Sequence, residues 1–221
     1  MSYRETNPQQ EEKHGRAFLR AVRNGTLRLY APKKRWTDML KACRLCGHAF
    51  ETVGHVLNHC RSHARLWHDD IQNRLTHAIA GNTPGARVVS VNQRVKDVGG
   101  SPLRPDIVID QSDGSRLLVD VTVPVEHVND AFRTRASFDK ARRTKIDKYR
   151  CVADALSARG VRTRVEALIV GALGTWDSKN APVLRQLGLV SDDLRDVLCR
   201  RTVTWARRIY DRHLKMGATC N

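Results

Sequence analysis

The 221-residue sequence lacks any long hydrophobic run. No stretch approaches the roughly 20 consecutive apolar residues that a membrane-spanning helix needs. The N-terminal stretch MSYRETNPQQEEKHGR has no apolar core, so we expect no secretory signal. Internal repeats and low-complexity tracts are also missing. These absences favour a globular, intracellular protein with one main domain and room for a small appended module.

Acidic residues are few relative to basic ones. The chain has 23 Asp and Glu against 39 Lys and Arg, which gives a net charge of +16 and a pI near 10.2. Such an excess goes beyond what solubility requires and points to a polyanionic partner. Nucleic acid is the leading candidate, because neutralising each phosphate releases counterions, whereas a membrane surface would call for an amphipathic anchor.

Three of the six cysteines cluster in the segment CRLCGHAFETVGHVLNHC. Without a secretory signal, clustered thiols indicate metal binding rather than disulfides. Cys43 and Cys46, two residues apart, can grip one face of a zinc ion, while His55 and Cys60 close the tetrahedron. His59 is an alternative fourth ligand, because it lies four residues after His55. We therefore expect a structural zinc ion in this segment.

Apolar periodicity and turn signals predict a mixed α/β fold, with helix, three strands, helix, strand and helices in that order. The loop GNTPG at residues 81–85 separates a zinc module with its following helix, residues 43–80, from a main domain at residues 86–216. A basic lead-in, residues 1–42, begins with polar residues that we expect to be frayed. The predicted strands are residues 86–95, 105–110, 116–124 and 165–173, and the predicted helices are residues 56–80, 130–158, 181–186 and 191–215.

The stretch RPDIVIDQSDGSRLLVDVTV places two acids in what otherwise reads as a pair of buried strands. A two-residue Asp-Gly turn would put Asp106 and Asp120 on opposite faces. A three- or five-residue loop with Gly114 in the left-handed conformation shifts the register by one residue. We prefer this second register, because it pairs Asp110 with Arg116 and matches Val108 with Leu118. As a consequence, it places Asp106 opposite Asp120.

Two carboxylates directly across an antiparallel pair repel each other unless a positive charge lies between them. A divalent cation with hard oxygen ligands fits, and Mg²⁺ is the usual choice for phosphate chemistry. The alternative is that one acid faces solvent while the other pairs with an arginine. The pattern leaves both interpretations open for Asp106 and Asp120.

The predicted helix at residues 130–158 carries a lysine in its apolar stripe. Lys145 lies between Phe138 and Tyr149 in the inward-facing positions. Its side chain either bends outward to solvent or points into a site where its ammonium meets carboxylates or a phosphate. Other basic residues of this helix are candidates for contacts with a nucleic-acid backbone, namely Arg135, Arg142, Arg143 and Lys148.

These motifs together resemble a known family. RPDIVID, the acid of LLVDVTV fourteen residues after Asp106, and KIDKY resemble the restriction-like endonuclease domain at the C-terminus of site-specific non-LTR retrotransposon proteins. That domain is a branch of the PD-(D/E)xK nucleases. The cysteine segment is similar to the zinc knuckle that precedes the nuclease in those proteins. The resemblance covers roughly residues 25–215 and implies a restriction-endonuclease-like core with an N-terminal knuckle.

Carried over by position, the resemblance makes Asp106 and Asp120 the metal-binding catalytic acids and Lys145 the catalytic lysine. Many PD-(D/E)xK enzymes place the lysine two residues after the second acid, where this chain has Thr122. The lysine therefore appears on the helix instead, a departure that is familiar in this branch. Two other lysines, Lys140 and Lys148, compete with Lys145 for the catalytic role. Tyr149 is expected to assist catalysis and is also a candidate DNA contact.

The resemblance implies a metal-dependent endonuclease, using Mg²⁺ or Mn²⁺, that nicks double-stranded target DNA in the nucleus to prime reverse transcription. Element RNA is a second expected partner. Because 42 residues cannot hold a polymerase, the family's reverse transcriptase is missing, as in a C-terminal fragment or truncated copy. Two alternatives remain: an inactive or repurposed copy that only binds DNA or RNA, and a restriction or repair nuclease of the same fold.

Overall fold

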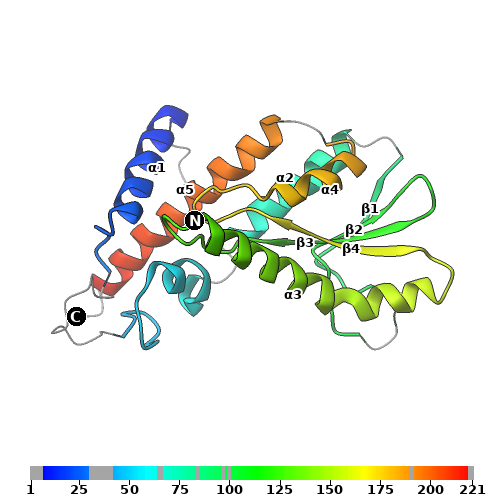
Figure 1. Ribbon diagram of the computed structural model, residues 1–221, viewed down its shortest axis with the longest axis horizontal. Helices are drawn as coiled ribbons and strands as arrows, with labels where there is room; N and C mark the ends of the chain where they lie inside the picture. Colours follow the sequence, from blue (N-terminus) through cyan, green and yellow to red (C-terminus); the bar gives the residue numbers. More distant parts are fainter. Residues whose placement is uncertain are drawn as a thin grey trace.

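The computed structural model describes residues 7–29, 42–63, 67–82, 85–95, 98, 101–189 and 192–218. A four-stranded mixed sheet forms its centre, in the order β1-β2-β3-β4 (Figure 1). The first three strands are antiparallel neighbours, and β4 runs parallel to β3 because α3 carries the chain back between them. The strands are β1 (Arg87–Val91), β2 (Ile107–Asp110), β3 (Arg116–Thr122) and β4 (Thr163–Ile169).

The helices follow the predicted order and make this a mixed α/β protein, as expected from the sequence. Within the described residues, no helix combines the length and the apolar character that crossing a membrane would take. The helical elements are α1 (Pro8–Arg23), η1 (His55–His59), η2 (Arg61–His63), α2 (His68–Asn82), α3 (Ala131–Ser157), η3 (Ser178–Asn180), α4 (Ala181–Gln186) and α5 (Asp192–Ala218). The sequence also predicts Ser191 as the N-cap of the last helix and a basic patch at residues 33–35, and these positions lie outside the described residues.

Alternating side chains give the sheet two buried faces. Ile107, Ile109 and Leu117 belong to a core that also contains buried residues of α2, α4 and α5. Val108 and Leu118, on the other face, pack with buried residues of α3. Both faces are therefore covered by helices, and the even-numbered positions of β2 and β3 look toward α3.

The hairpin between β2 and β3 adopts the preferred register. Asp110 pairs with Arg116 and Val108 with Leu118. Gly114 has a φ of 74°, and the amide of Gln111 donates to the carbonyl of Ser115 at 2.8 Å, closing a three-residue loop. The Arg116 guanidinium also reaches the Asp110 carboxylate, with Nε 2.6 Å from Oδ1. The opposite charges that favoured this register are thus in direct contact.

The N-terminal region differs from the expectation of a frayed start. Residues 8–23 form α1, capped by Asn7, whose side chain accepts from the Gln9 amide at 3.0 Å. Phe18 and Val22 bury their side chains in a second core, which α1 shares with η1 and α5. Figure 1 shows α1 beside α5 and away from the sheet. Helix α1 is ordered because its apolar stripe has a partner far away in the sequence.

The packing of α2 does not follow the domain boundary that the sequence predicted at residues 81–85. Ile71, Leu75 and Ile79 of α2 are fully buried against the sheet, so α2 belongs with the main layer rather than with the zinc segment. The sequence pattern could not show this, because an amphipathic helix does not reveal which surface it covers.

Arg142 points into the protein. Its guanidinium donates to the Ala167 carbonyl on β4, to Asp177 at 2.7 Å and to Asn180 at 2.9 Å. The side chains of Arg142 and Asp177 are only 12% and 9% exposed. Although the sequence suggested Arg142 as a contact for nucleic acid, its donors are used here to join α3 to β4 and η3.

We expect Arg142→Ala to lower the free energy of unfolding by about 3 kcal/mol, because it leaves the buried Asp177 carboxylate unpaired. Chemical denaturation followed by circular dichroism measures this. Arg143→Ala, at the neighbouring exposed position, is the matched control and should change stability little. Equal stability of the two variants would contradict the structural role of Arg142.

Candidate metal centre and acidic site

Four predicted zinc ligands converge in the knuckle, which we define as residues 42–60. The donor atoms of Cys43, Cys46, His55 and Cys60 all lie within 4.8 Å of one another. The Cys43 and Cys60 sulfurs are 3.9 Å apart, and Nε2 of His55 is 3.2 Å from the Cys46 sulfur. Two Zn–S bonds of about 2.3 Å in a tetrahedron separate their sulfurs by roughly 3.8 Å. The donor set and its spacing are compatible with a structural zinc site.

The titration behaviour of the cluster also suits a cation. Burial raises the pKa of the Cys60 thiol to about 11, and the neighbouring Cys43 and Cys46 add to this effect. Burial lowers the pKa of His55, so its ring is held in the neutral form that binds metal. A bound cation would offset the cost of three clustered thiolates.

His59 lies outside the cluster. Its side chain is exposed, whereas Cys60 is 3% exposed and contributes its sulfur to the group of four. Residues 55–59 form a single π-helical turn, and the chain leaves it in an extended conformation at Cys60. The change of backbone conformation at Cys60 points the side chains of His59 and Cys60 in different directions. Cys60, not His59, is therefore the fourth candidate zinc ligand.

A buried polar network behind the cluster was missed by the sequence analysis. Nε2 of His213, on α5, lies 2.5 Å from Oε1 of Glu51, and its Nδ1 lies 3.1 Å from Nε2 of His63. Arg44 donates to both Glu51 oxygens, at 2.6 and 2.9 Å. His213 Nε2 is also 3.9 Å from the Cys43 sulfur. No local motif predicts this network, because His213 lies 150 residues or more from His63 and Glu51 in the sequence.

The second site lies where β2 begins and β3 approaches its end. Asp120 is 1% exposed, and Nζ of Lys145 lies 2.5 Å from its Oδ2. The Lys145 ammonium is thus the partner of this buried carboxylate oxygen. Burial and the charge of Asp106 raise the pKa of Asp120. The Lys145 side chain therefore points into the site and contacts a carboxylate, rather than bending outward to solvent.

Asp106 precedes β2 at the position that the register sets opposite Asp120. Its Oδ2 accepts from the Val121 amide at 2.7 Å and lies 3.0 Å from Nε2 of His68. The hydrogen bond to Asp106 raises the pKa of His68. His68, at the start of α2, is a further site residue that the sequence gave no reason to select. The second oxygen of Asp106 makes no hydrogen bond within the described part of the chain.

Tyr149 lies beneath this site. It is 1% exposed, its hydroxyl donates to the Arg104 carbonyl at 2.8 Å, and Nζ of Lys148 donates to it at 2.8 Å. Burial and the Asp120 charge raise the pKa of Tyr149, which keeps the hydroxyl protonated. Tyr149 was expected to contact DNA, but its ring lies inside the protein, where its hydroxyl contacts Lys148 and the Arg104 carbonyl.

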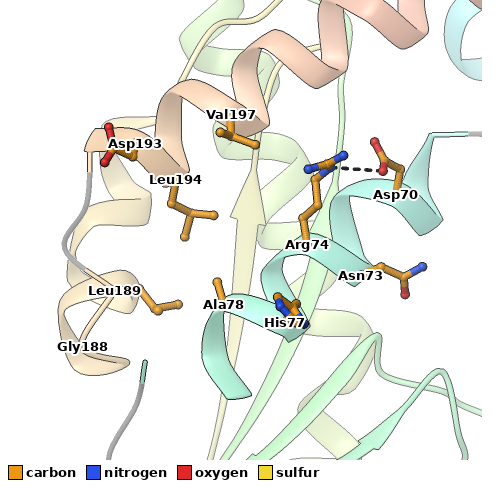
Figure 2. Close-up of a pocket in the computed structure, with 10 residues that line it drawn as sticks. All are labelled: Asp70, Asn73, Arg74, His77, Ala78, Gly188, Leu189, Asp193, Leu194 and Val197. Atoms are coloured by element: carbon orange, nitrogen blue, oxygen red, sulfur yellow. Dashed lines mark hydrogen bonds and ion pairs between the residues drawn. The ribbon is translucent and has the colours of Figure 1, made fainter. Parts of the chain in front are cut away.

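The remaining candidate contacts for nucleic acid lie on the surface of α3. Arg135, Arg143 and Lys148 are exposed, and so is Lys140, which competed with Lys145 for the catalytic position. A pocket of about 810 Å³ elsewhere, between α2 and the start of α5, is lined by residues such as Arg74 and Val197 (Figure 2). It includes none of the predicted site residues.

The three-donor metal clusters among the described residues all involve the knuckle and its network. Asp106, Asp120 and His68 therefore do not form a group as compact as the one around Cys43. No protein-family model matches this sequence, and no curated protein matches it. The zinc-type cluster is the metal site that the geometry supports directly.

We expect Cys60→Ser to lose bound zinc and His59→Gln to retain it. Of these two residues, only Cys60 contributes a donor atom to the cluster. Zinc per chain, measured by elemental mass spectrometry on purified protein, tests this. Loss of zinc in His59→Gln together with retention in Cys60→Ser would reverse the assignment.

We expect Asp120→Asn to stabilise the protein in the absence of divalent cations. Because the pKa of Asp120 is raised above 3.8, the folded chain binds a proton that the unfolded chain releases, and stability is lost as pH rises through the folded-state pKa. In urea unfolding, the advantage of Asp120→Asn should therefore grow as pH rises above 3.8 and through the raised pKa of Asp120, and then level off. Asp147→Asn, which removes an exposed acid of α3, is the control and should show no such trend.

Proposed function

We propose that this protein is a metal-dependent endonuclease that nicks DNA. The observation that carries the proposal is the ion pair between Lys145 and Asp120, formed beside Asp106. Two acids and a lysine in one corner of a mixed sheet are the groups that phosphodiester hydrolysis requires. The proposal is also supported by the order of the elements, because the hairpin of β2 and β3 supplies the two acids and the next helix, α3, supplies the lysine.

Asp106 and Asp120 would hold the catalytic cation. Asp120 offers the buried carboxylate that contacts Lys145, and Asp106 offers the oxygen that is not used by Val121 or His68. Carboxylate oxygens of this kind suit Mg²⁺ or Mn²⁺. When bound, the cation would supply charge neutralisation at the phosphate and a lowered pKa for water. The repulsion that raises the pKa of Asp120 would then be relieved.

The other residues of the site have distinct tasks in this proposal. The Lys145 ammonium, 26% exposed in its side chain, can turn from Asp120 to a phosphate oxygen or to the attacking water. His68 and the Val121 amide hold one Asp106 oxygen and so orient the carboxylate. Tyr149 fixes the chain at Arg104, just before the first acid.

Zinc would be structural, and the exposed bases of α3 would bind the DNA backbone. The net charge of +16 supports a nucleic-acid partner. We infer double-stranded target DNA, with element RNA as a second partner, and a nuclear location, in keeping with the similarity to retrotransposon nucleases. The nick would expose a 3′-hydroxyl that primes reverse transcription, and the polymerase would come from another part of the element.

We expect Asp120→Asn and Lys145→Met each to reduce nicking of supercoiled plasmid by about 10²-fold or more, because each removes a charge at the reacting phosphate. The assay follows conversion to open circles with Mg²⁺ or Mn²⁺. Zinc content and the circular dichroism spectrum should be unchanged. Lys179→Met, which removes an exposed lysine from outside the site, is the matched control and should nick normally.

If Asp120→Asn nicked plasmid as fast as the wild type, the catalytic role of Asp120 would be contradicted, and the activity would come from a contaminating nuclease. If the wild-type chain binds DNA with either cation but cuts nothing, the protein is a binding module that has lost or changed its activity. The compactness of the zinc-type cluster relative to the acidic site is the observation that favours this second candidate.

A further inference from the structure

A surface pocket of about 660 Å³ lies between the knuckle and α3. Its floor is the segment that follows β3, residues 122–128, and one wall is formed by residues 52–54, 58 and 59 of the knuckle. The other wall is one stripe of α3, made of Ser137, Lys140, Ala141, Thr144 and Lys145. We call it the knuckle pocket.

The knuckle pocket and the acidic site share one residue. Lys145 belongs to both, since its side chain lines the pocket and its Nζ contacts Asp120. Thr122, two residues beyond Asp120 on the same face of β3, lines the floor. A ligand in the pocket would therefore be adjacent to any phosphate held at the acids.

The walls of the pocket are held in place by contacts within the protein. The Asn58 side-chain amide donates to the Val123 carbonyl at 3.0 Å, which joins the knuckle to the floor. Val56 and Leu57 are buried in the same core as Val123. The shape of the pocket thus depends on the zinc segment and is formed before any ligand arrives.

The pocket lining suits a nucleotide. Lys140 is exposed and makes no ion pair with any residue in the described ranges, so its ammonium is available for a phosphate. His59 and His127 present exposed rings that can stack on a base, and Val123 and Pro124 give the floor an apolar surface. Glu126 also lines the pocket, but its carboxylate is turned away to accept from the Leu173 and Thr175 amides.

The size of the pocket excludes a duplex. A volume of about 660 Å³ is that of a site for one small ligand, whereas a DNA duplex has a major groove wide enough to admit a whole α-helix. Only an unpaired nucleotide can enter such a pocket while its phosphate remains at the acids. The exposed bases of α3 remain available for the paired DNA on either side.

We propose that the knuckle pocket takes up an unpaired nucleotide next to the scissile phosphate, so that the preferred substrate is DNA that is locally unpaired at the cut. This inference rests on the proposed nuclease function, which it deepens by specifying the substrate. His59, which zinc binding leaves free, and Lys140 are the residues that hold the nucleotide.

Two substrates of the same sequence test the proposal, one a complete duplex and the other with a short unpaired bubble. The wild-type chain with Mg²⁺ should nick the bubble about tenfold faster or more, because the duplex must first pay for unstacking a base. His59→Ala and Lys140→Ala should each lose about fivefold or more on the bubble. Lys140→Ala should also reduce the salt dependence of binding by about one counterion.

Arg150→Ala is the matched control for charge. Arg150 is exposed on the part of α3 that does not line the pocket, where it pairs with Asp147. Its loss should leave the preference for the bubble intact. Zinc content is measured for His59→Ala, so that an effect through the knuckle is recognised.

Binding is measured separately, by fluorescence anisotropy with Asp120→Asn and no divalent cation. Equal cutting of the two substrates, with no effect of His59→Ala or Lys140→Ala, would overturn the pocket proposal while leaving the nuclease in place. Tighter binding of the bubble that depends on both residues, without cleavage by the wild type, would overturn the nuclease and support the pocket as a site for unpaired DNA.

Discussion

The pairing of Asp110 with Arg116 across β2 and β3 is the constraint on which the acidic site depends. Because side chains alternate along a strand, a slip of one residue would turn Asp120 toward the α2 face. Lys145 comes from α3, so the two could then not meet. The ion pair, the three-residue loop and the left-handed Gly114 all act on the same register. The register of this hairpin thus determines which helix can contribute a side chain to the acidic site.

The knuckle depends on a different kind of contact. Its metal-binding atoms come from a short segment, but their surroundings come from α1 and α5. His213 and Glu51 are completely buried, and Glu51 also pairs with Arg44 while His213 pairs with His63. Histidines and carboxylates behind metal ligands orient them and exclude water. The zinc segment is therefore part of the fold rather than an appendage to it.

Local signals in the sequence were sufficient for much of this structure. The zinc-ligand spacing, the Asp-Gly loop and the lysine in an apolar stripe each depend on neighbouring residues. Most strands and helices fall close to their predicted positions, but the single helix predicted at residues 56–80 was wrong: η1 and η2 occupy its first part, and α2 begins only at His68. What failed was non-local. The inward turn of Arg142, the contact of His68 with Asp106 and the packing of α1 on α5 join residues far apart in the chain. Periodicity shows that a face is buried without showing against what.

The position of His213 has a consequence for the order in which the protein forms. Helix α5 follows every other helix of the described residues in sequence, yet it contributes the buried imidazole beside Cys43. During synthesis the four zinc ligands emerge long before that helix does, so a metal ion bound early would remain open to water on one side. Enclosure of the metal and completion of the second core would then be a single late event, because α5 supplies both.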